Sequence, residues 1–281
     1  MTDDGLARNS FPNNGFVSTS EEEHEISTIT RIIEFEKLEL KAPVLVQGLP
    51  GVGFVGKIAI DYFIEELKPP KIAEAYSTYL TLPDGDMGVK VESNGTYTLP
   101  KYEFYAHHEN TPQIIFLTGD IQPSPWGQYR VAEEVLDFVA GFGCRTVIAL
   151  GGYSTPQNLE AVYAISNDLA LIDGFQSRVK IARSGVVKGA FGVLLGLGQK
   201  RGMNCLGLLG ATRGIYPDPR SSRNVVHVLA DMLNLPVDLT GLDQNIADVE
   251  SKMKRLRRIQ RGVPMPQESG REGEPPGAYI I

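Results

Sequence analysis

The chain has 281 residues, a formal net charge of −7 and 42% hydrophobic residues, which are ordinary values for a globular protein. The acidic balance argues against a nucleic-acid-binding protein, which would need a basic surface to displace counterions. The N-terminus does not resemble a signal peptide, and the longest apolar run, residues 189–198, is too short to span a bilayer. Cys144 and Cys205 lie in apolar stretches, so we expect buried free thiols in a cytoplasmic protein without a membrane partner.

Residues 1–27 are polar and acidic, and the sequence predicts a disordered N-terminal arm there. The alternating strand and helix patterns of residues 28–238 predict one α/β domain. A first strand is expected within 28–35. The apolar run 44–47 predicts a second strand, and the glycine-rich loop 48–56 connects it to a helix that ends before two prolines.

Strands and helices alternate through the rest of this domain. Asn94-Gly95 predicts a hairpin. Apolar runs predict buried strands in the segments QIIFLTGD, CRTVIALGG and MNCLGLLGAT, a further strand is expected at 162–166, and helices are predicted at 125–141, 189–202 and 220–233. Because the apolar runs leave no solvated face, we expect a mostly parallel central sheet with helices on both faces.

The C-terminal part of the chain differs from the domain. Residues 239–261 predict one long helix, with Ile246, Val249, Met253 and Leu256 in heptad spacing. This apolar stripe fits packing within the chain or between subunits. The cations near the end of the helix fit a solvated face that complements the helix dipole. Residues 262–281 are rich in Gly, Pro and Glu and predict a flexible tail.

The loop after the second strand carries the sharpest motif. Gly51, Gly53 and Gly56 match a dinucleotide fingerprint, with Glu74 near the distance expected for a ribose-binding acid. Gly51 to Lys57 also matches part of a P-loop, although Ile58 stands where a magnesium-binding hydroxyl is needed. Two interpretations stay open: a cofactor site in a nucleotide- or dinucleotide-binding enzyme, or a turn that packs a helix tightly on a sheet.

Other signs of catalysis are weak. His107 and His108 are adjacent, so on a strand they would point to opposite faces and could not chelate one metal ion. The segment Gly151-Gly152-Tyr153-Ser154 is not a nucleophile elbow. We therefore expect no catalytic residue, no metal and no cofactor.

The polar tail ends in four apolar or aromatic residues, Ala278, Tyr279, Ile280 and Ile281. A tethered peptide of this kind can bind a partner by burying its ring and pairing its terminal carboxylate. The other interpretation is a tail that folds back on its own domain or makes no contact.

Several segments together resemble the archaeal members of the proteasome assembly chaperone family, over about residues 28–260. They are GLPGVGFVGKIAIDYFIEEL, KIAEAY, LTGDIQPSP, VIALGGYST and GLLGATRGIYPDPRSSRNVVHVLADMLNL, in family order, and the most specific are the glycine loop and the Tyr-Pro-Asp-Pro segment at 216–219. The resemblance implies an α/β fold, a homo-oligomer, binding to proteasome α-subunits or the α-ring, and no catalytic residue.

Some relatives in that family end in a hydrophobic–Tyr–any tripeptide that docks between α-subunits. Tyr279 and Ala278 resemble the tyrosine and the hydrophobic residue, but Tyr279 is third from the end rather than second. The resemblance thus implies a non-catalytic chaperone that oligomerises and binds proteasome α-subunits or the α-ring, with the tail as a candidate contact. The alternatives are the enzyme using the glycine loop and an oligomeric scaffold without a proteasome link.

Overall fold

The computed structural model describes residues 30–35, 38–109, 111–215, 217–244 and 246–247. A nine-stranded sheet with the order β1-β3-β6-β7-β2-β8-β11-β9-β10 forms its centre. The strands are β1 (Thr30–Glu34), β2 (Val44–Gly48), β3 (Lys71–Ser77), β6 (Tyr102–His107), β7 (Ile114–Gly119), β8 (Thr146–Ser154), β9 (Val162–Ser166), β10 (Val179–Ile181) and β11 (Asn204–Thr212). The helices are α1 (Val55–Leu67), α2 (Gln128–Gly141), α3 (Gly189–Lys200) and α4 (Pro219–Leu233), with short 3-10 helices η1 (Val52–Phe54) and η2 (Leu169–Ile172).

The sheet is mixed, so the prediction of a mostly parallel sheet is correct only for its centre. Strands β7, β2, β8 and β11 run parallel to their neighbours in this order. The pairs β1–β3, β3–β6, β6–β7 and β11–β9 are antiparallel. Apolar strand runs did not reveal this, because a strand covered on both faces has the same composition in either direction.

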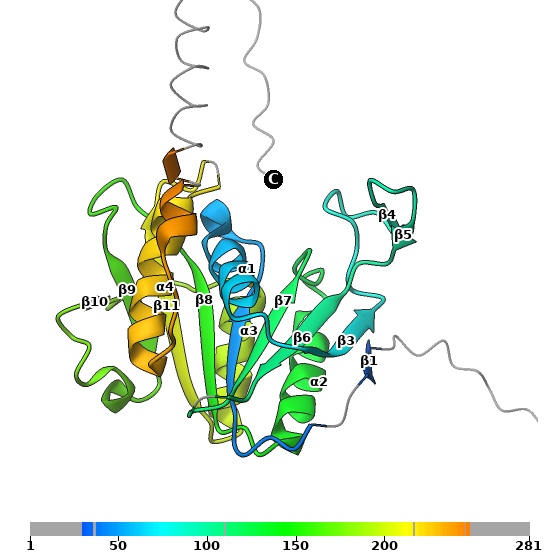
Figure 1. The fold of residues 1–281 in the computed structure, drawn as a ribbon, viewed down its shortest axis with the longest axis horizontal. Helices are drawn as coiled ribbons and strands as arrows, with labels where there is room; N and C mark the ends of the chain where they lie inside the picture. The colour runs from blue at the N-terminus through cyan, green and yellow to red at the C-terminus, as the bar shows by residue number, and fades with distance from the viewer. Residues whose placement is uncertain (1–29, 36–37, 110, 216, 245, 248–281) are drawn as a thin grey trace, which may run out of the picture.

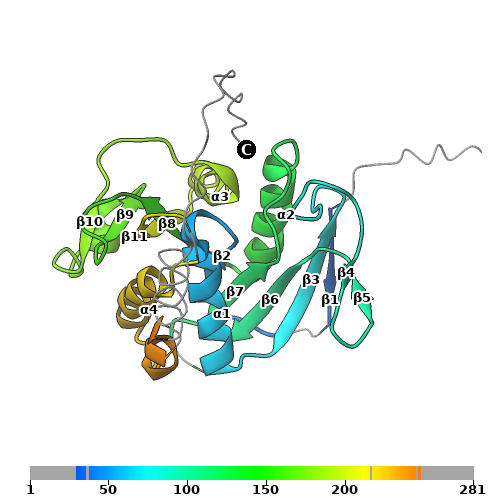
Figure 2. The same ribbon diagram turned by 90° about the horizontal axis from the view of Figure 1, so that it is seen from above.

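Helices cover both faces of the sheet, as expected. Figure 2 shows α2 and α3 on one side and α1 and α4 on the other. In Figure 1, α1 and α4 lie in front of the central strands, while β1, β3 and β6 continue beyond α1 at the right. The face of β3 and β6 on the α1 side is therefore left without a helix across it.

Two hydrophobic clusters hold these layers together. Beneath α1 and α4, Phe63 stacks on Phe116 of β7 with ring centroids 5.8 Å apart. Beneath α2 and α3, Phe138 of α2 meets Phe104 of β6 edge-on at 4.8 Å. Each parallel strand supplies alternate residues to the two clusters, which explains its continuous apolar sequence.

Two predictions on smaller segments have different outcomes. The Asn94-Gly95 hairpin is present as a separate two-stranded sheet, β4 (Lys90–Val91) with β5 (Tyr97–Thr98). The long helix predicted at 239–261 is described only at its start, where residues 240–244 and 246–247 are helical. The remaining residues of that helix, the N-terminal arm and the tail lie outside the described residues.

Candidate functional site

The glycine loop connects β2 to α1, at the edge of the sheet where the parallel strands have their carboxyl ends. An added Cβ at Gly56 would lie 2.1 Å from the carbonyl oxygen of Leu150 on β8. At Gly48 it would lie 2.3 Å from the carbonyl oxygen of Gly56. These two glycines therefore allow the first turn of α1 to touch the sheet, and neither is free to receive a phosphate group.

Gly53 joins this loop to the segment before α4. Its φ of 61° lies in the left-handed region, and an added Cβ would lie 2.9 Å from the hydroxyl oxygen of Thr212. The carbonyl oxygen of Gly53 accepts a 2.8 Å hydrogen bond from the backbone N–H of Asp218. The Asp218 carboxylate in turn accepts hydrogen bonds from the Thr212 hydroxyl (2.7 Å) and from the backbone N–H of Ser221 (3.1 Å). Asp218 thus caps α4 and ties the loop to the end of β11.

Lys57 does not point toward a phosphate position. Its ammonium group binds both carboxylate oxygens of Asp61, at 2.7 and 2.5 Å, one helical turn along α1. Asp61 also accepts a 2.8 Å hydrogen bond from the Thr118 hydroxyl on β7. The lysine of the partial P-loop is therefore held on the α1 face of the sheet.

Glu74 also lies away from the loop. It belongs to β3, and β6 and β7 lie between β3 and β2 in the sheet. Since neighbouring strands are about 4.8 Å apart, Glu74 is roughly 14 Å from β2 across the sheet. In a dinucleotide fold the acid follows the strand next to the glycine loop. The structure does not bring Glu74 to Gly51, Gly53 and Gly56.

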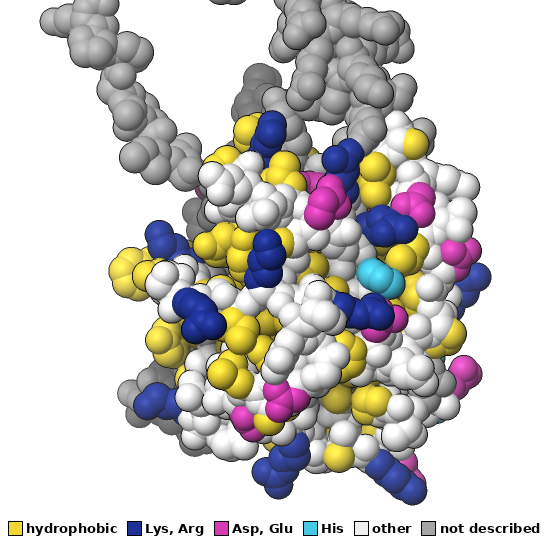
Figure 3. Space-filling view, turned by 90° about the vertical axis from the view of Figure 1, so that its left-hand side faces the viewer, with side chains coloured by type: hydrophobic (Ala, Val, Ile, Leu, Met, Phe, Trp, Pro, Cys, Tyr) yellow, Lys and Arg dark blue, Asp and Glu magenta, His cyan; other side chains and the backbone are white. Residues whose placement is uncertain are grey.

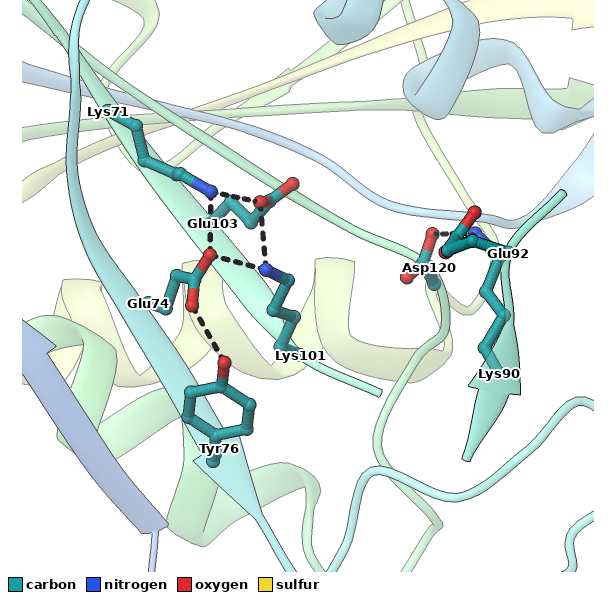
Figure 4. A network of polar contacts seen from close by, with 8 residues as sticks. All are labelled: Lys71, Glu74, Tyr76, Lys90, Glu92, Lys101, Glu103 and Asp120. Atoms are coloured by element: carbon teal, nitrogen blue, oxygen red, sulfur yellow. Dashed lines mark hydrogen bonds and ion pairs between the residues drawn. The ribbon is translucent and has the colours of Figure 1, made fainter. Parts of the chain in front are cut away.

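Glu74 belongs instead to a charged network on β3 and β6 (Figure 4). It lies directly opposite Glu103, and the ammonium groups of Lys71 and Lys101 bridge the two carboxylates. Burial raises the pKa of Glu74, but hydrogen bonds from Lys101, Lys71 and Tyr76 outweigh it and lower that pKa to about 2. The network neutralises the part of the sheet that no helix covers.

The described histidines and cysteines show no sign of a reactive group. His107 is buried, which lowers its pKa, whereas its neighbour His108 is exposed. Cys144 and Cys205 are buried free thiols, and burial raises the pKa of Cys205 to about 11. Among the residues with a described position, no three His, Cys, Asp or Glu side chains are grouped closely enough to hold a metal ion. No helix in those same residues is long and apolar enough to cross a membrane.

The carboxyl edge of the sheet is rich in exposed apolar side chains. Trp126, in the segment between β7 and α2, is 90% exposed, and Ile215, after β11, is 69% exposed. Val52 and Phe54 in the glycine loop, and Val186 before α3, are also exposed. We call these five residues the apolar edge. Large exposed apolar groups on neighbouring loops are typical of surfaces that bind other proteins.

The edge also holds a cavity of about 670 Å³, between the glycine loop and the segment 182–189. Gly51, singled out in the sequence, lines it, but sequence reasoning missed other lining residues, which include Gln47, Gln122, Arg183, Lys188 and Phe191. The sequence offered one sign of this cavity, which is a polar residue, Gln47, at the end of the otherwise apolar run VLVQ. The predicted partner-binding residues Ala278, Tyr279, Ile280 and Ile281 lie outside the described residues, so the structure does not place them.

Comparison with known proteins assigns the chain to a family. The model of the PAC2 family matches residues 45–257. An uncharacterized protein of Methanocaldococcus jannaschii is 31% identical over 226 residues, which cover 80% of this chain and 90% of that protein.

Solved structures agree with that assignment. PbaB of Pyrococcus furiosus, an archaeal proteasome activator, is 32% identical with a TM-score of 0.75 and covers 82% of this chain and 99% of its own. PbaA of the same organism, an archaeal homolog of proteasome-assembly chaperone, is 27% identical with a TM-score of 0.70, over 83% of this chain and 93% of its own. The resemblance found in the sequence is confirmed: the chain belongs to the PAC2 family, among the archaeal relatives of proteasome assembly chaperones.

Proposed function

We propose that this protein is a non-catalytic proteasome assembly chaperone that forms homo-oligomers and binds proteasome α-subunits or the α-ring. The observation that carries the proposal is its similarity to PbaB and PbaA, which extends over more than four fifths of the chain. PbaB is an archaeal proteasome activator, and PbaA is an archaeal homolog of proteasome-assembly chaperone. Such a chaperone would favour ring formation by raising the local concentration of subunits.

The glycine loop supports the non-catalytic assignment. Gly48, Gly53 and Gly56 are needed for packing, and Lys57 is paired with Asp61. The rival proposal, a nucleotide- or dinucleotide-binding enzyme using Gly51, Gly53, Gly56 and Lys57, needs those groups at a bound phosphate. It would therefore require rearrangement of the junction between α1 and β8.

The apolar edge offers a surface for a protein partner. Trp126 is the chain's single tryptophan, and it stands almost fully in solvent. Tryptophan is enriched among the residues that dominate binding energy in protein interfaces. An interface with another copy of the chain or with an α-subunit would remove Trp126, Phe54 and Ile215 from water.

The tail adds a second, tethered contact in this proposal. Residues 262–277 are too polar and too rich in Gly and Pro to form a core of their own, so they would act as a linker to Ala278–Ile281. A tethered peptide occupies even a weak pocket on a surface that the domain already contacts. Tyr279 and the carboxylate of Ile281 would be its main anchors.

Ring assembly tests the proposal. Separately purified archaeal α-subunits are mixed with or without the full chain, and ring formation is followed by native gel electrophoresis. We expect faster ring formation and an α-subunit band that contains the chain. Unchanged ring formation with no such band would overturn the proposal. In parallel, light scattering measures the molar mass of the chain alone in solution. A mass above that of one chain reports self-association.

A further inference from the structure

The cavity at the carboxyl edge lies on the opposite side of the sheet from Lys57. It opens between the glycine loop and the segment 182–189, and Gly51 and Val52 form part of its wall. Leu150, Leu209 and Phe191 supply apolar surface, while Tyr153 lines it and packs on Tyr163 with ring centroids 4.5 Å apart. Its volume of about 670 Å³ lies within the usual range for small-molecule sites.

Gln47 brings an unsatisfied amide to this cavity. Its side chain is only 4% exposed, and it makes no hydrogen bond with any residue whose position is described. The fully buried atom without a partner is its Oε1, and leaving such an acceptor unmet is costly.

A second, smaller cavity beneath Gln47 accounts for part of this demand. It has a volume of about 10 Å³, and Tyr102, whose buried hydroxyl also lacks a partner, lines it too. One water molecule there could accept from Tyr102 and donate to Gln47 Oε1. The NH₂ group of Gln47 is not among the fully buried atoms and makes no hydrogen bond to a described residue. The larger cavity is where a ligand can supply one.

The wall opposite the glycine loop is positively charged. Arg183 and Lys188 line the cavity and form no ion pair within the described part of the chain. Helix α3 begins at the same wall with no acidic residue in its first turn, and only the N–H of Ala190 is bonded to a side chain, that of Gln122, so the helix dipole adds positive potential. None of the lining residues is acidic. On the face in Figure 3, Lys and Arg side chains are spread among hydrophobic ones, and Asp and Glu side chains are interspersed with them.

Gln122 fixes the two walls relative to each other. Its Nε2 donates to the carbonyl oxygen of Pro50 at 2.6 Å, and its Oε1 accepts from the backbone N–H of Ala190 at 3.0 Å. The same side chain therefore joins the glycine loop to the first turn of α3. The cavity is held open by hydrogen bonds already made, which is typical of a preformed site.

We propose that this cavity binds a small planar organic anion. A carboxylate or phosphate group would lie at Arg183, Lys188 and the start of α3, a ring would pack against Phe191, and an amide-type edge would pair with Gln47. Gly51 of the dinucleotide fingerprint lies in the cavity wall, but the anion position is at the start of α3 and not at the start of α1, where that fingerprint would place a phosphate. It is also independent of proteasome binding.

Fragment binding to the full chain tests this proposal. The probes are 4-carbamoylbenzoate and 4-carbamoylphenyl phosphate, which carry both the amide and the anion. Benzoate lacks the amide, benzamide lacks the anion, and inorganic phosphate lacks both the ring and the amide. Dissociation constants are measured by ligand-observed NMR, and we expect both complete probes to bind more tightly than all three partial ones. The ratio between the two complete probes reports whether the anion site prefers carboxylate or phosphate.

Variants assign the contacts. Removing both cations with Arg183→Ala/Lys188→Ala should weaken the complete probes by about tenfold or more, because charge-assisted hydrogen bonds are lost. Gln47→Leu should reduce the advantage of 4-carbamoylbenzoate over benzoate. The matched control Lys180→Ala/Lys200→Ala removes two exposed cations outside the cavity and should leave binding unchanged. No binding by the complete probes at millimolar concentration, equal binding of inorganic phosphate, or equal loss in the control variant would overturn the proposal.

Discussion

The backbone N–H of Asp218 donates a 2.8 Å hydrogen bond to the carbonyl oxygen of Gly53. The two residues belong to the two segments with the most specific resemblance to the family, far apart in the sequence. Their contact brings the two motifs together in the folded chain. The glycine loop leads into the first turn of α1, and Asp218 caps the first turn of α4. This hydrogen bond therefore connects the N-terminal ends of the two helices.

Asp218→Ala should lower the free energy of unfolding by about 2 kcal/mol, because α4 loses its cap and the buried hydroxyl of Thr212 loses an acceptor. Asp218→Asn keeps one side-chain oxygen and should cost less. Urea unfolding followed by circular dichroism measures both. Equal stability of the alanine variant and the parent would show that the cap has no energetic role.

Gly56→Ala should destabilise the protein by about 1–3 kcal/mol or prevent folding, since the new methyl group would meet the carbonyl of Leu150. Gly196→Ala is the matched control. That glycine is also helical, but it is exposed and has no atom within 4 Å of an added Cβ. The control should be stabilised by about 0.5–1 kcal/mol, because alanine is a better helix former. Thermal unfolding of the two variants distinguishes them, and a Gly56→Ala protein as stable as the parent would contradict the packing role.

Nucleotide binding that depends on Lys57 should be absent. Calorimetry with ATP, NAD and NADP on the parent and on Lys57→Ala tests this, with Lys68→Ala, at the opposite end of α1, as a control. We expect no micromolar binding by the glycine loop, because Asp61 holds the ammonium group on the α1 face. Micromolar binding that is abolished by Lys57→Ala would instead favour the nucleotide- or dinucleotide-binding enzyme.

The charged network on β3 and β6 should make stability depend on pH. The pKa of Glu74 is about 2 in the folded protein against an ordinary value of 4.5. A carboxylate whose pKa is lower in the folded than in the unfolded state contributes its full stabilisation of the fold at pH values above the unfolded-state pKa. That contribution is lost as the pH falls from about 4.5 to 2. Glu74→Gln should therefore cost on the order of 2 kcal/mol at pH 7 and much less at pH 3. Glu34→Gln, at an exposed position of β1, should show no such difference. A pH-independent cost of Glu74→Gln in urea unfolding would argue against the network.

Much of the fold could be predicted from the sequence, and the failures have physical causes. Periodicity placed the strand at 162–166 and the helices at 189–202 and 220–233, which the structure shows as β9, α3 and α4. The antiparallel flanks were missed, because strand direction depends on connections that composition does not encode.

The candidate site was harder to predict than the fold. The spacing of Gly51, Gly53 and Gly56 is shared by phosphate-binding loops and tight helix–sheet junctions, and only the contacts with Leu150 and Thr212 distinguish them. Glu74 had the right distance in sequence but lies on a strand inserted elsewhere in the sheet. The cavity combines residues from β2, from the segment after β7 and from the segment before α3, so no local pattern contains it.

Surface plasmon resonance tests directly whether the protein binds the proteasome α-ring. Purified archaeal α-rings are immobilised, and the full chain is passed over them beside three variants: Tyr279→Ala, a chain without residues 278–281, and Trp126→Ala. Our account predicts saturable binding of the full chain, weaker binding of all three variants, and unchanged circular dichroism. Equal affinity without residues 278–281 would place the contact on the folded domain alone. Absence of any binding by the full, folded chain would contradict the account.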